Sequence, residues 1–156
     1  MWIKLIAFTL FTIFSAIGGS PQKTAGEKIE MIVEIARKLG DVPPNDAVEL
    51  EMTDSKGGRL ALLHQVNKGV PTLFIIFVVQ AENTDAGVDS ERIPLTFVCE
   101  DKGARGILTK DSCDVHGNNR IVTTEDIGVD EPTLMTLFND ALNEILHALG
   151  NRDARI

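Results

Sequence analysis

The ten residues Val70-Pro-Thr-Leu-Phe-Ile-Ile-Phe-Val-Val79 form a nearly unbroken apolar run that decides the fold. Their β-branched and aromatic content favours a strand over a helix. An apolar run without polar alternation is typical of a strand that is buried on both faces. We therefore expect this segment to be a strand in the middle of a sheet, covered on both sides.

Turn residues separate this run from further predicted strands. Asp54 to Gly58 and Asn67 to Gly69 have the polar and glycine content of tight turns. Residues 81–92 and 110–119 are polar and irregular, and they predict loops on the other side of the run. We expect strands at residues 48–53, 59–66, 70–79, 95–100, 106–109 and, at one edge of the sheet, 120–123.

A capping box opens the first predicted helix. Thr24 and Glu27 have the spacing at which each side chain accepts a hydrogen bond from the backbone N–H of the other residue. Apolar residues then recur at helical spacing as far as Leu39, and Gly40 stands where a helix stop is expected. The sequence therefore predicts an amphipathic helix over residues 24–39.

A second amphipathic helix is predicted near the C-terminus. Asp130 is a suitable N-cap, and Pro132 falls in the first turn, where its missing N–H costs little. An apolar stripe then runs from Leu134 to Leu149, and Gly150 is expected to end the helix. The fold class is therefore α+β: an antiparallel sheet of about five to six strands, flanked by an N-terminal and a C-terminal helix packed on one face.

Residues 1–18 have the pattern of a secretory signal peptide. Lys4 precedes about a dozen mostly apolar residues, whereas a membrane-spanning helix needs roughly 20, and small residues suit cleavage after Gly18. Cleavage after Gly19 is an alternative, as are an uncleaved anchor and a buried first helix. We expect one exported domain over residues 19–156, periplasmic or extracellular, with no stable membrane anchor after cleavage.

The charge of the chain restricts its partners. It has 15 Lys and Arg against 23 Asp and Glu, and loss of Lys4 with the signal peptide would change the net charge from −8 to −9. Such a domain is repelled by nucleic acid and by anionic lipid. Phe74, Phe77, Phe97 and Phe138, the aromatic residues outside the signal segment, lie in apolar runs that look like core rather than base-stacking surface. We expect no nucleic-acid binding, and a protein with a basic surface is the favoured partner.

The two cysteines, Cys99 and Cys113, predict a structural disulfide. An even cysteine count in an exported chain is typical of disulfide bonding. Closing a loop of about 15 residues stabilises the fold by roughly 3 kcal/mol on the chain-entropy estimate. A buried pair of thiols and a redox couple are the alternatives, although a redox couple normally uses Cys-x-x-Cys.

Three histidines are candidates for acid–base chemistry. His64 falls in a predicted strand and His147 in the C-terminal helix, where structural roles are common. His116 falls in the predicted polar loop, where it is a candidate general base, although a solvated turn has the same composition. Its polar neighbours are Asp111, Asp114, Asn118 and Asn119. We assign no catalytic residue and no cofactor, and lean towards a protein that is not an enzyme.

Several acidic groups contain the residue types of metal sites without their spacing. Cys113, Asp114 and His116 do not have a zinc pattern. Two acidic loops lack the residue order of a calcium loop. Their acids are Asp85, Asp89 and Glu91 in one loop, and Glu125, Asp126, Asp130 and Glu131 in the other. We therefore predict no metal site.

Three functional hypotheses follow. The first is a small acidic protein that binds another protein, as an inhibitor, an immunity-type protein or an envelope accessory subunit, through the acidic loops 81–92 and 124–131. The second is a carrier of an apolar small ligand or lipid, with residues 70–79 lining a cavity beneath the helices. The third is a hydrolase that uses His116 with an acidic partner from its loop.

Overall fold

The computed structural model of the chain describes two helices and seven strands. The described residues are 3–5, 22–53, 59–83, 92–107, 112–117, 120–122 and 129–153. The elements are β1 (Ile3–Leu5), α1 (Ala25–Gly40), β2 (Val48–Thr53), β3 (Arg59–Asn67), β4 (Val70–Asn83), β5 (Arg92–Lys102), β6 (Cys113–Gly117), β7 (Arg120–Val122) and α2 (Glu131–Asp153).

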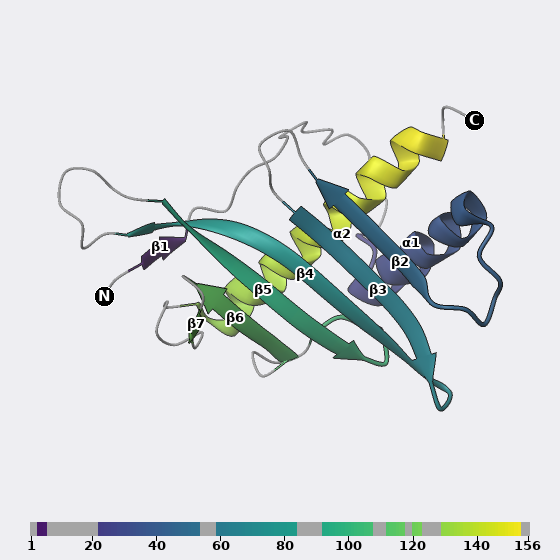
Figure 1. The fold of residues 1–156 in the computed structure, drawn as a ribbon, viewed down its shortest axis with the longest axis horizontal. Helices are drawn as coiled ribbons and strands as arrows, with labels where there is room; N and C mark the ends of the chain where they lie inside the picture. The colour runs from purple at the N-terminus through teal and green to yellow at the C-terminus, as the bar shows by residue number, and fades with distance from the viewer. Residues whose placement is uncertain are drawn as a thin grey trace.

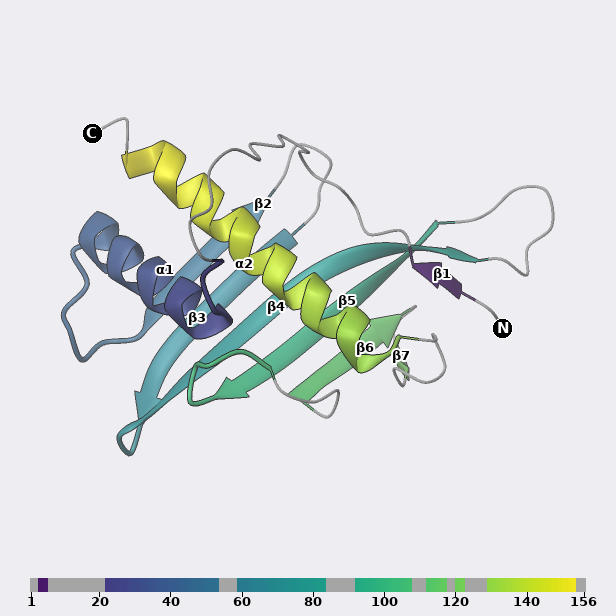
Figure 2. The ribbon, with the colours of Figure 1, turned by 180° about the vertical axis from the view of Figure 1, so that it is seen from behind.

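The strands form one antiparallel sheet in which β2 to β7 follow one another in sequence order (Figure 1). Strand β1 stands off this path and pairs with residues 81–83 at the end of β4. Both helices lie on the same face of the sheet, with α2 running diagonally across it and α1 beside α2 (Figure 2). The predicted α+β class, with both helices on one face of an antiparallel sheet, is confirmed.

The capping box of α1 forms as predicted. The N–H of Glu27 donates to Thr24 Oγ1 at 3.3 Å, and the N–H of Thr24 donates to Glu27 Oε2 at 2.7 Å. The hydrogen bonds that the backbone N–H and the hydroxyl of Thr24 donate to the Glu27 carboxylate lower the pKa of that carboxyl. At the other end, Gly40 is the last helical residue, and Asp41 takes the left-handed conformation with φ 49°. The stop therefore falls one residue beyond the predicted glycine.

The predicted N-cap of α2 is also confirmed, but the predicted C-terminal end of this helix is not. Asp130 Oδ1 accepts a hydrogen bond from the N–H of Thr133 at 2.8 Å. Hydrogen bonding by the side chain and then the backbone of Thr133 lowers the pKa of the Asp130 carboxyl. The helix continues through Gly150 to Asp153. A glycine inside a helix costs only about 1 kcal/mol, so it does not by itself end one.

The hydrophobic core fills the space between the helices and one face of the sheet. Ile32 of α1 and Leu142 of α2 are fully buried in it. The rings of Phe77 and Phe97 stack in adjacent strands, with centroids 5.1 Å apart. Strand β4 contributes four consecutive inward side chains, Leu73, Ile75, Phe77 and Val79.

The strand predictions between β5 and β7 were partly wrong. Residues 113–117 form β6, although an irregular loop was predicted there. Residues 106 and 107, part of the predicted strand 106–109, are not in a strand, and residues 108–111 lie outside the described part of the chain. The physical reason is a turn at the end of β5, where the N–H of Gly106 donates to the buried Asp101 carboxylate at 2.6 Å. Gly106 has φ +98°, and a Cβ there would stand 2.7 Å from Ala25 Cβ, so this position needs glycine.

The two predicted acidic loops lie mostly outside the described residues. Strand β4 runs on to Asn83 and β5 begins at Arg92, so residues 84–91 are all that remains of the first loop between them. Of the second loop, residues 124–128 are not described. Residues 6–21, most of the predicted signal peptide, are also outside the described part. The signal peptide and its cleavage stay predictions.

Strand β4 is central, as predicted, but its burial differs from the prediction. It pairs with β3 on one side and β5 on the other. Of the elements that the structure describes, both helices lie on the same face of the sheet and cover it, and none covers the opposite face (Figure 2). The expectation of a strand buried on both faces was therefore wrong, and the other face of β4 carries the candidate site.

Candidate functional site

The sheet face that points away from the helices carries a group of apolar side chains. Successive residues of a strand point to opposite faces, so Phe74, Ile76 and Val78 of β4 lie on this outer face. Their register partners on β3 and β5 extend the group sideways. We define the outer apolar stripe as Ala61, Leu63, Phe74, Ile76, Val78 and Val98.

The outer apolar stripe is only partly covered. Ile76, near its middle, keeps 37% of its surface exposed, whereas the neighbouring Ile75 on the core face is fully buried. The remaining members of the stripe are half-buried. An apolar group of this kind on a solvent-facing sheet is a recognised feature of interaction surfaces.

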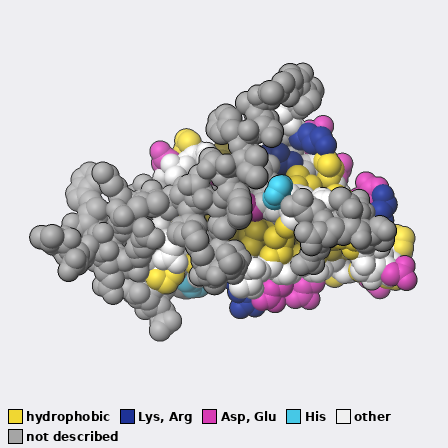
Figure 3. Space-filling model, turned by 90° about the horizontal axis from the view of Figure 1, so that it is seen from above, with side chains coloured by type: hydrophobic (Ala, Val, Ile, Leu, Met, Phe, Trp, Pro, Cys, Tyr) yellow, Lys and Arg dark blue, Asp and Glu magenta, His cyan; other side chains and the backbone are white. Residues whose placement is uncertain are grey.

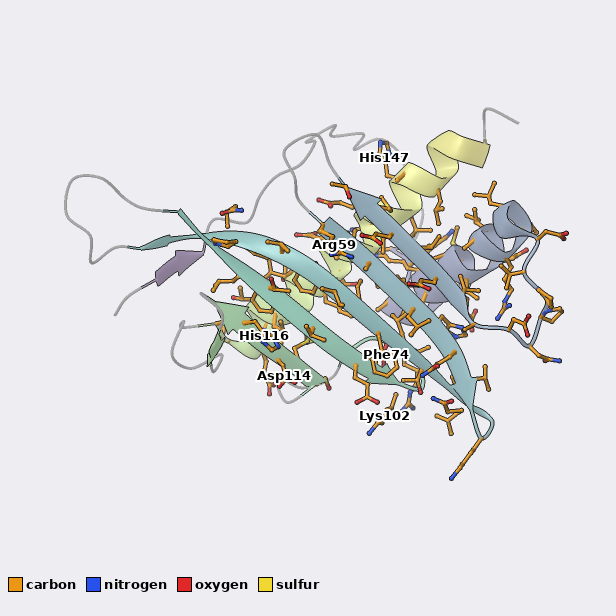
Figure 4. The ribbon with its side chains drawn as sticks, viewed as in Figure 1. Arg59, Phe74, Lys102, Asp114, His116 and His147 are labelled. Atoms are coloured by element: carbon orange, nitrogen blue, oxygen red, sulfur yellow. A yellow bond between two sulfur atoms is a disulfide. The ribbon has the colours of Figure 1, made fainter. Side chains whose placement is uncertain are left out.

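Carboxylates border this stripe along both of its long sides. On the β2 side, Glu49 is the register partner of Leu63, and Glu51 is the partner of Ala61. On the opposite side, Glu100 on β5 is the partner of Phe74, and Asp114 on β6 is the partner of Val98. We call these four residues the acidic borders. Figure 4 shows Phe74 in β4 and Asp114 in β6, with Arg59 and Lys102 at the two ends of the group.

Two cations partly balance these acids. Arg59 lies 2.8 Å from Glu51, and Lys102 lies 3.9 Å from Glu100. All four side chains are more than one-third exposed, so each ion pair contributes little to stability and exchanges readily with other partners. Glu49 and Asp114 add two further carboxylates, which leaves the border negatively charged.

The space-filling view shows the same charge pattern. Figure 3 looks down on the molecule from above, so that the outer face runs along the lower margin of the picture. Acidic side chains gather in the middle of that margin, with a basic side chain next to them. The acids therefore lie at the surface of the outer face, where a partner can reach them.

The three histidines occupy different environments. His116 lies on β6 beside Thr96 of β5, on the outer face and not in the predicted polar loop (Figure 4). Asp114 is two residues away on the same face. The loop residues Asp111, Asn118 and Asn119 lie outside the described part, so the general-base site stays a prediction. His147 is exposed on α2.

His64 is the polar exception in the core. It is buried on the inner face of β3, opposite Val48 of β2 and Leu73 of β4. Its Nδ1 is buried without a hydrogen-bond partner among the described residues. Burial, with a smaller contribution from Arg37 of α1, lowers the pKa of His64 below its usual 6.5. The imidazole therefore favours its neutral form in the folded protein.

Within the described residues, no group of three or more His, Cys, Asp or Glu is arranged to hold a metal ion. Cys113 is in a disulfide, and Asp130 caps α2. The remaining acids considered for calcium, apart from Glu131 in the first turn of α2, lie in undescribed segments; they are Asp85, Asp89, Glu91, Glu125 and Asp126.

The predicted disulfide is present. Cys99 of β5 and Cys113 of β6 are direct register partners, with Cα atoms 4.0 Å apart, and their sulfur atoms are joined. Both residues face the core. The bond fixes β6 to β5, and it therefore also fixes the position of Asp114 on the opposite face. A disulfide of this kind is typical of an oxidising compartment.

Comparison with known protein families, with curated proteins and with solved structures finds no significant match. Among the described residues, neither helix is both long and apolar enough to cross a membrane.

Sequence reasoning missed the outer face because it took the apolar run of β4 as a sign of burial on both sides. A signal was nevertheless available. Two helices on one face leave nothing predicted to cover the other, and the acids of β2 occupy the polar positions of a strand expected beside that run.

Proposed function

We propose that this protein acts by binding another protein, one with basic groups, through the outer face of its sheet. The observation that carries this proposal is the outer apolar stripe with carboxylates along both of its sides. Apolar contact supplies affinity, and charge complementarity supplies orientation and a faster encounter. The inhibitor, immunity-type and envelope accessory roles each require a surface that binds another protein, and we propose the outer face for it.

The proposed place of action is outside the cytoplasm, in a periplasm or an extracellular space. The Cys99–Cys113 disulfide supports an oxidising compartment. The signal-like pattern of residues 1–18 supports export. The acidic character of the chain favours a basic protein over nucleic acid or anionic lipid.

The other two predicted functions, an apolar-ligand carrier and a hydrolase, gain no specific support. The inward side chains of β4, which would line a carrier cavity, belong to the cluster that packs against both helices. His116 and Asp114 stand on the same face of β6, while Asp111, Asn118 and Asn119 lie outside the described residues. Both functions stay predictions from the sequence.

The test is capture of a binding partner from an exported-protein extract at low salt. Wild-type protein is compared with Ile76→Glu, which places a charge in the middle of the outer apolar stripe. The control is Val66→Glu, which changes a valine that is 51% exposed and points by alternation to the other side of the sheet. We expect capture by wild type and by Val66→Glu, and loss of capture by Ile76→Glu and at high salt.

Two results would contradict the proposal. An empty wild-type capture at low salt would remove the protein-binding function. Equal capture by wild type and Ile76→Glu would place the binding site elsewhere on the molecule. Circular dichroism of each variant checks that the fold is retained.

A further inference from the structure

We propose that the outer face receives an amphipathic helix of the partner, lying along β3 and β4, with apolar residues on the outer apolar stripe and Lys or Arg on both flanks. This inference rests on the proposed function and specifies the chemistry of the partner. The order of residues across the sheet carries it, because apolar side chains stand between two acids in two successive register rows. These rows are Glu49, Leu63, Phe74 and Glu100, and Glu51, Ala61, Ile76, Val98 and Asp114.

The width of the face fits one helix. In register, Glu49, Leu63, Phe74 and Glu100 stand side by side on β2, β3, β4 and β5. Neighbouring strands are about 4.8 Å apart, so the backbone positions of Glu49 and Glu100 are about 14 Å apart. Those of Glu51 and Asp114, which are one strand further apart, are separated by about 19 Å. A helix with its side chains is about 10–12 Å wide. One helix fills this space, and basic side chains on its flanks reach the acids on either side.

The direction of the helix follows from the arrangement of the acids. Glu49 and Glu51 succeed each other along β2, while Phe74, Ile76 and Val78 succeed each other along β4. The apolar region is therefore elongated in the strand direction. A helix parallel to the strands keeps its apolar residues over the outer apolar stripe, whereas a helix across the strands would press them against carboxylates, which is costly.

The length of the contact can also be estimated. Phe74 to Val78 spans four residue steps, or about 14 Å at about 3.4 Å per step. At 1.5 Å per residue, that length corresponds to about nine helical residues. The expected recognition element thus has apolar residues at i, i+3, i+4 and i+7, and cations beside them.

Two other occupants fit less well. An extended segment binds by adding a strand to a sheet edge, but the backbone of β4 is already paired with β3 and β5. A second copy of the chain would bring the same acidic borders towards each other, in a protein that is already strongly acidic. A cationic helix satisfies both the apolar and the charged part of the face.

The test uses three designed peptides of about 14 residues, or four helical turns. The first has a Leu stripe flanked by Lys, the second has the same composition in scrambled order, and the third replaces Lys by Glu. Binding to the full disulfide-bonded chain is measured by fluorescence anisotropy. We expect the first peptide to bind at least tenfold more tightly than either of the others. NMR shifts should concentrate on Leu63, Phe74, Ile76 and Val98.

Variants locate the site. We expect Ile76→Glu to weaken binding of the first peptide at least tenfold, and Glu49→Lys to weaken it about fivefold, since one border is reversed in charge. Matched controls make the same changes elsewhere. Val66→Glu is the control for Ile76→Glu and adds an acid on the opposite side of the sheet. Glu30→Lys is the control for Glu49→Lys and reverses the charge of an exposed acid on α1. Both controls should stay within about twofold of wild type.

Three results would overturn the inference. The first is equal binding of the amphipathic and scrambled peptides, because charge alone would then suffice. The second is binding that Ile76→Glu leaves unchanged. The third is the appearance of the same NMR shifts on raising the protein concentration without peptide, with a dimer in sedimentation, which would assign the face to a second copy. Failure of the proposed function is recognised separately: a natural partner would then be captured equally well by wild type and by Ile76→Glu.

Discussion

The two faces of β4 are built from nearly the same residues but have opposite environments. Leu73, Ile75, Phe77 and Val79 point inwards and are almost completely buried, whereas Phe74, Ile76 and Val78 point outwards and are only partly covered. The difference arises from what packs against each face, since both helices cover the inner one. Apolar composition therefore indicates only that burial of a face is favourable. Whether the chain itself buries that face depends on where its other elements pack.

The two faces of the sheet differ more clearly in the residues of the strands beside β4 than in those of β4 itself. On the inner face, β4 has Cys99 and Phe97 of β5 as register partners, and both are fully buried. On the outer face, the corresponding partners include the charged Glu100. A face bordered by carboxylates is suited to a partner that binds reversibly from solution. The carboxylates stay hydrated when no partner is bound, so the free protein carries no unpaired buried charge.

The largest expected effect comes from adjacent isoleucines on the two faces. Ile75→Ala should lower the free energy of unfolding by about 2–5 kcal/mol, because it leaves a cavity in the core. Ile76→Ala should lower it by about 1 kcal/mol or less, because that side chain is partly exposed. Urea unfolding of the two variants measures both values. Equal losses would mean that the two faces are equally buried in the free protein.

The same pair should behave in the opposite way in binding. Ile76→Ala should weaken the Lys-flanked amphipathic peptide severalfold, while the folded fraction of Ile75→Ala binds as wild type does. Anisotropy titrations, corrected for the folded fraction, measure this. A binding loss confined to Ile75→Ala would reverse the assignment of the two faces.

The fold could be predicted from sequence mainly where the signals were local. Thr24 with Glu27, and Asp130 with Thr133, are contacts within one helical turn, so their residue types identify the helix starts directly. Strand β6 was missed although Cys113 and Val115 alternate with Asp114 and His116, which is a strand pattern. The polar residues of that short segment resembled a turn, and only pairing with β5 distinguishes the two.

The candidate site could be predicted only in part. The acidic charge followed from composition, and a basic protein partner stays a prediction, but the location of the acids did not follow from composition. The expected acidic loops lie mostly outside the described residues. The acidic borders come instead from three different strands, and they are Glu49, Glu51, Glu100 and Asp114. Sequence alone does not give the register that places Glu49 and Glu100 on either side of Phe74.

The second prediction concerns the bond that joins the inner face of β5 to β6. Replacing both Cys99 and Cys113 by Ala should lower the free energy of unfolding by about 2–4 kcal/mol, through the loss of a cross-link that closes about 15 residues. Urea unfolding of the double variant and of wild type measures the loss. Addition of a reductant should destabilise only wild type. An unchanged midpoint for the double variant would show that the cross-link does not constrain the unfolded chain.

The third prediction uses the ionisable side chain of His64 on the inner face. Its pKa is lowered in the folded protein, so the unfolded chain takes up a proton at a higher pH than the folded chain does. The unfolded state then binds more protons as pH falls through about 6.5, and the free energy of unfolding should decrease in that range. His64→Leu should remove this part of the pH dependence, as measured by urea midpoints from neutral to mildly acidic pH. A wild-type midpoint that rises on acidification would contradict the burial of a neutral imidazole.

The smallest effect on stability is expected on the outer face, at the ion pair between Arg59 and Glu51. Arg59→Gln should change the free energy of unfolding by less than about 1 kcal/mol, since the pair is exposed. It should nevertheless tighten binding of the Lys-flanked peptide by about twofold to threefold at low salt, because Glu51 no longer has a competing cation and the face becomes more negative. The gain should disappear at high salt. Lys38→Gln, which removes a cation from α1 on the other side of the sheet, is the matched control and should leave binding within experimental error. Weaker binding by Arg59→Gln would mean that the cationic flanks of the peptide do not lie against Glu51, and would exclude the proposed placement of the helix on this face.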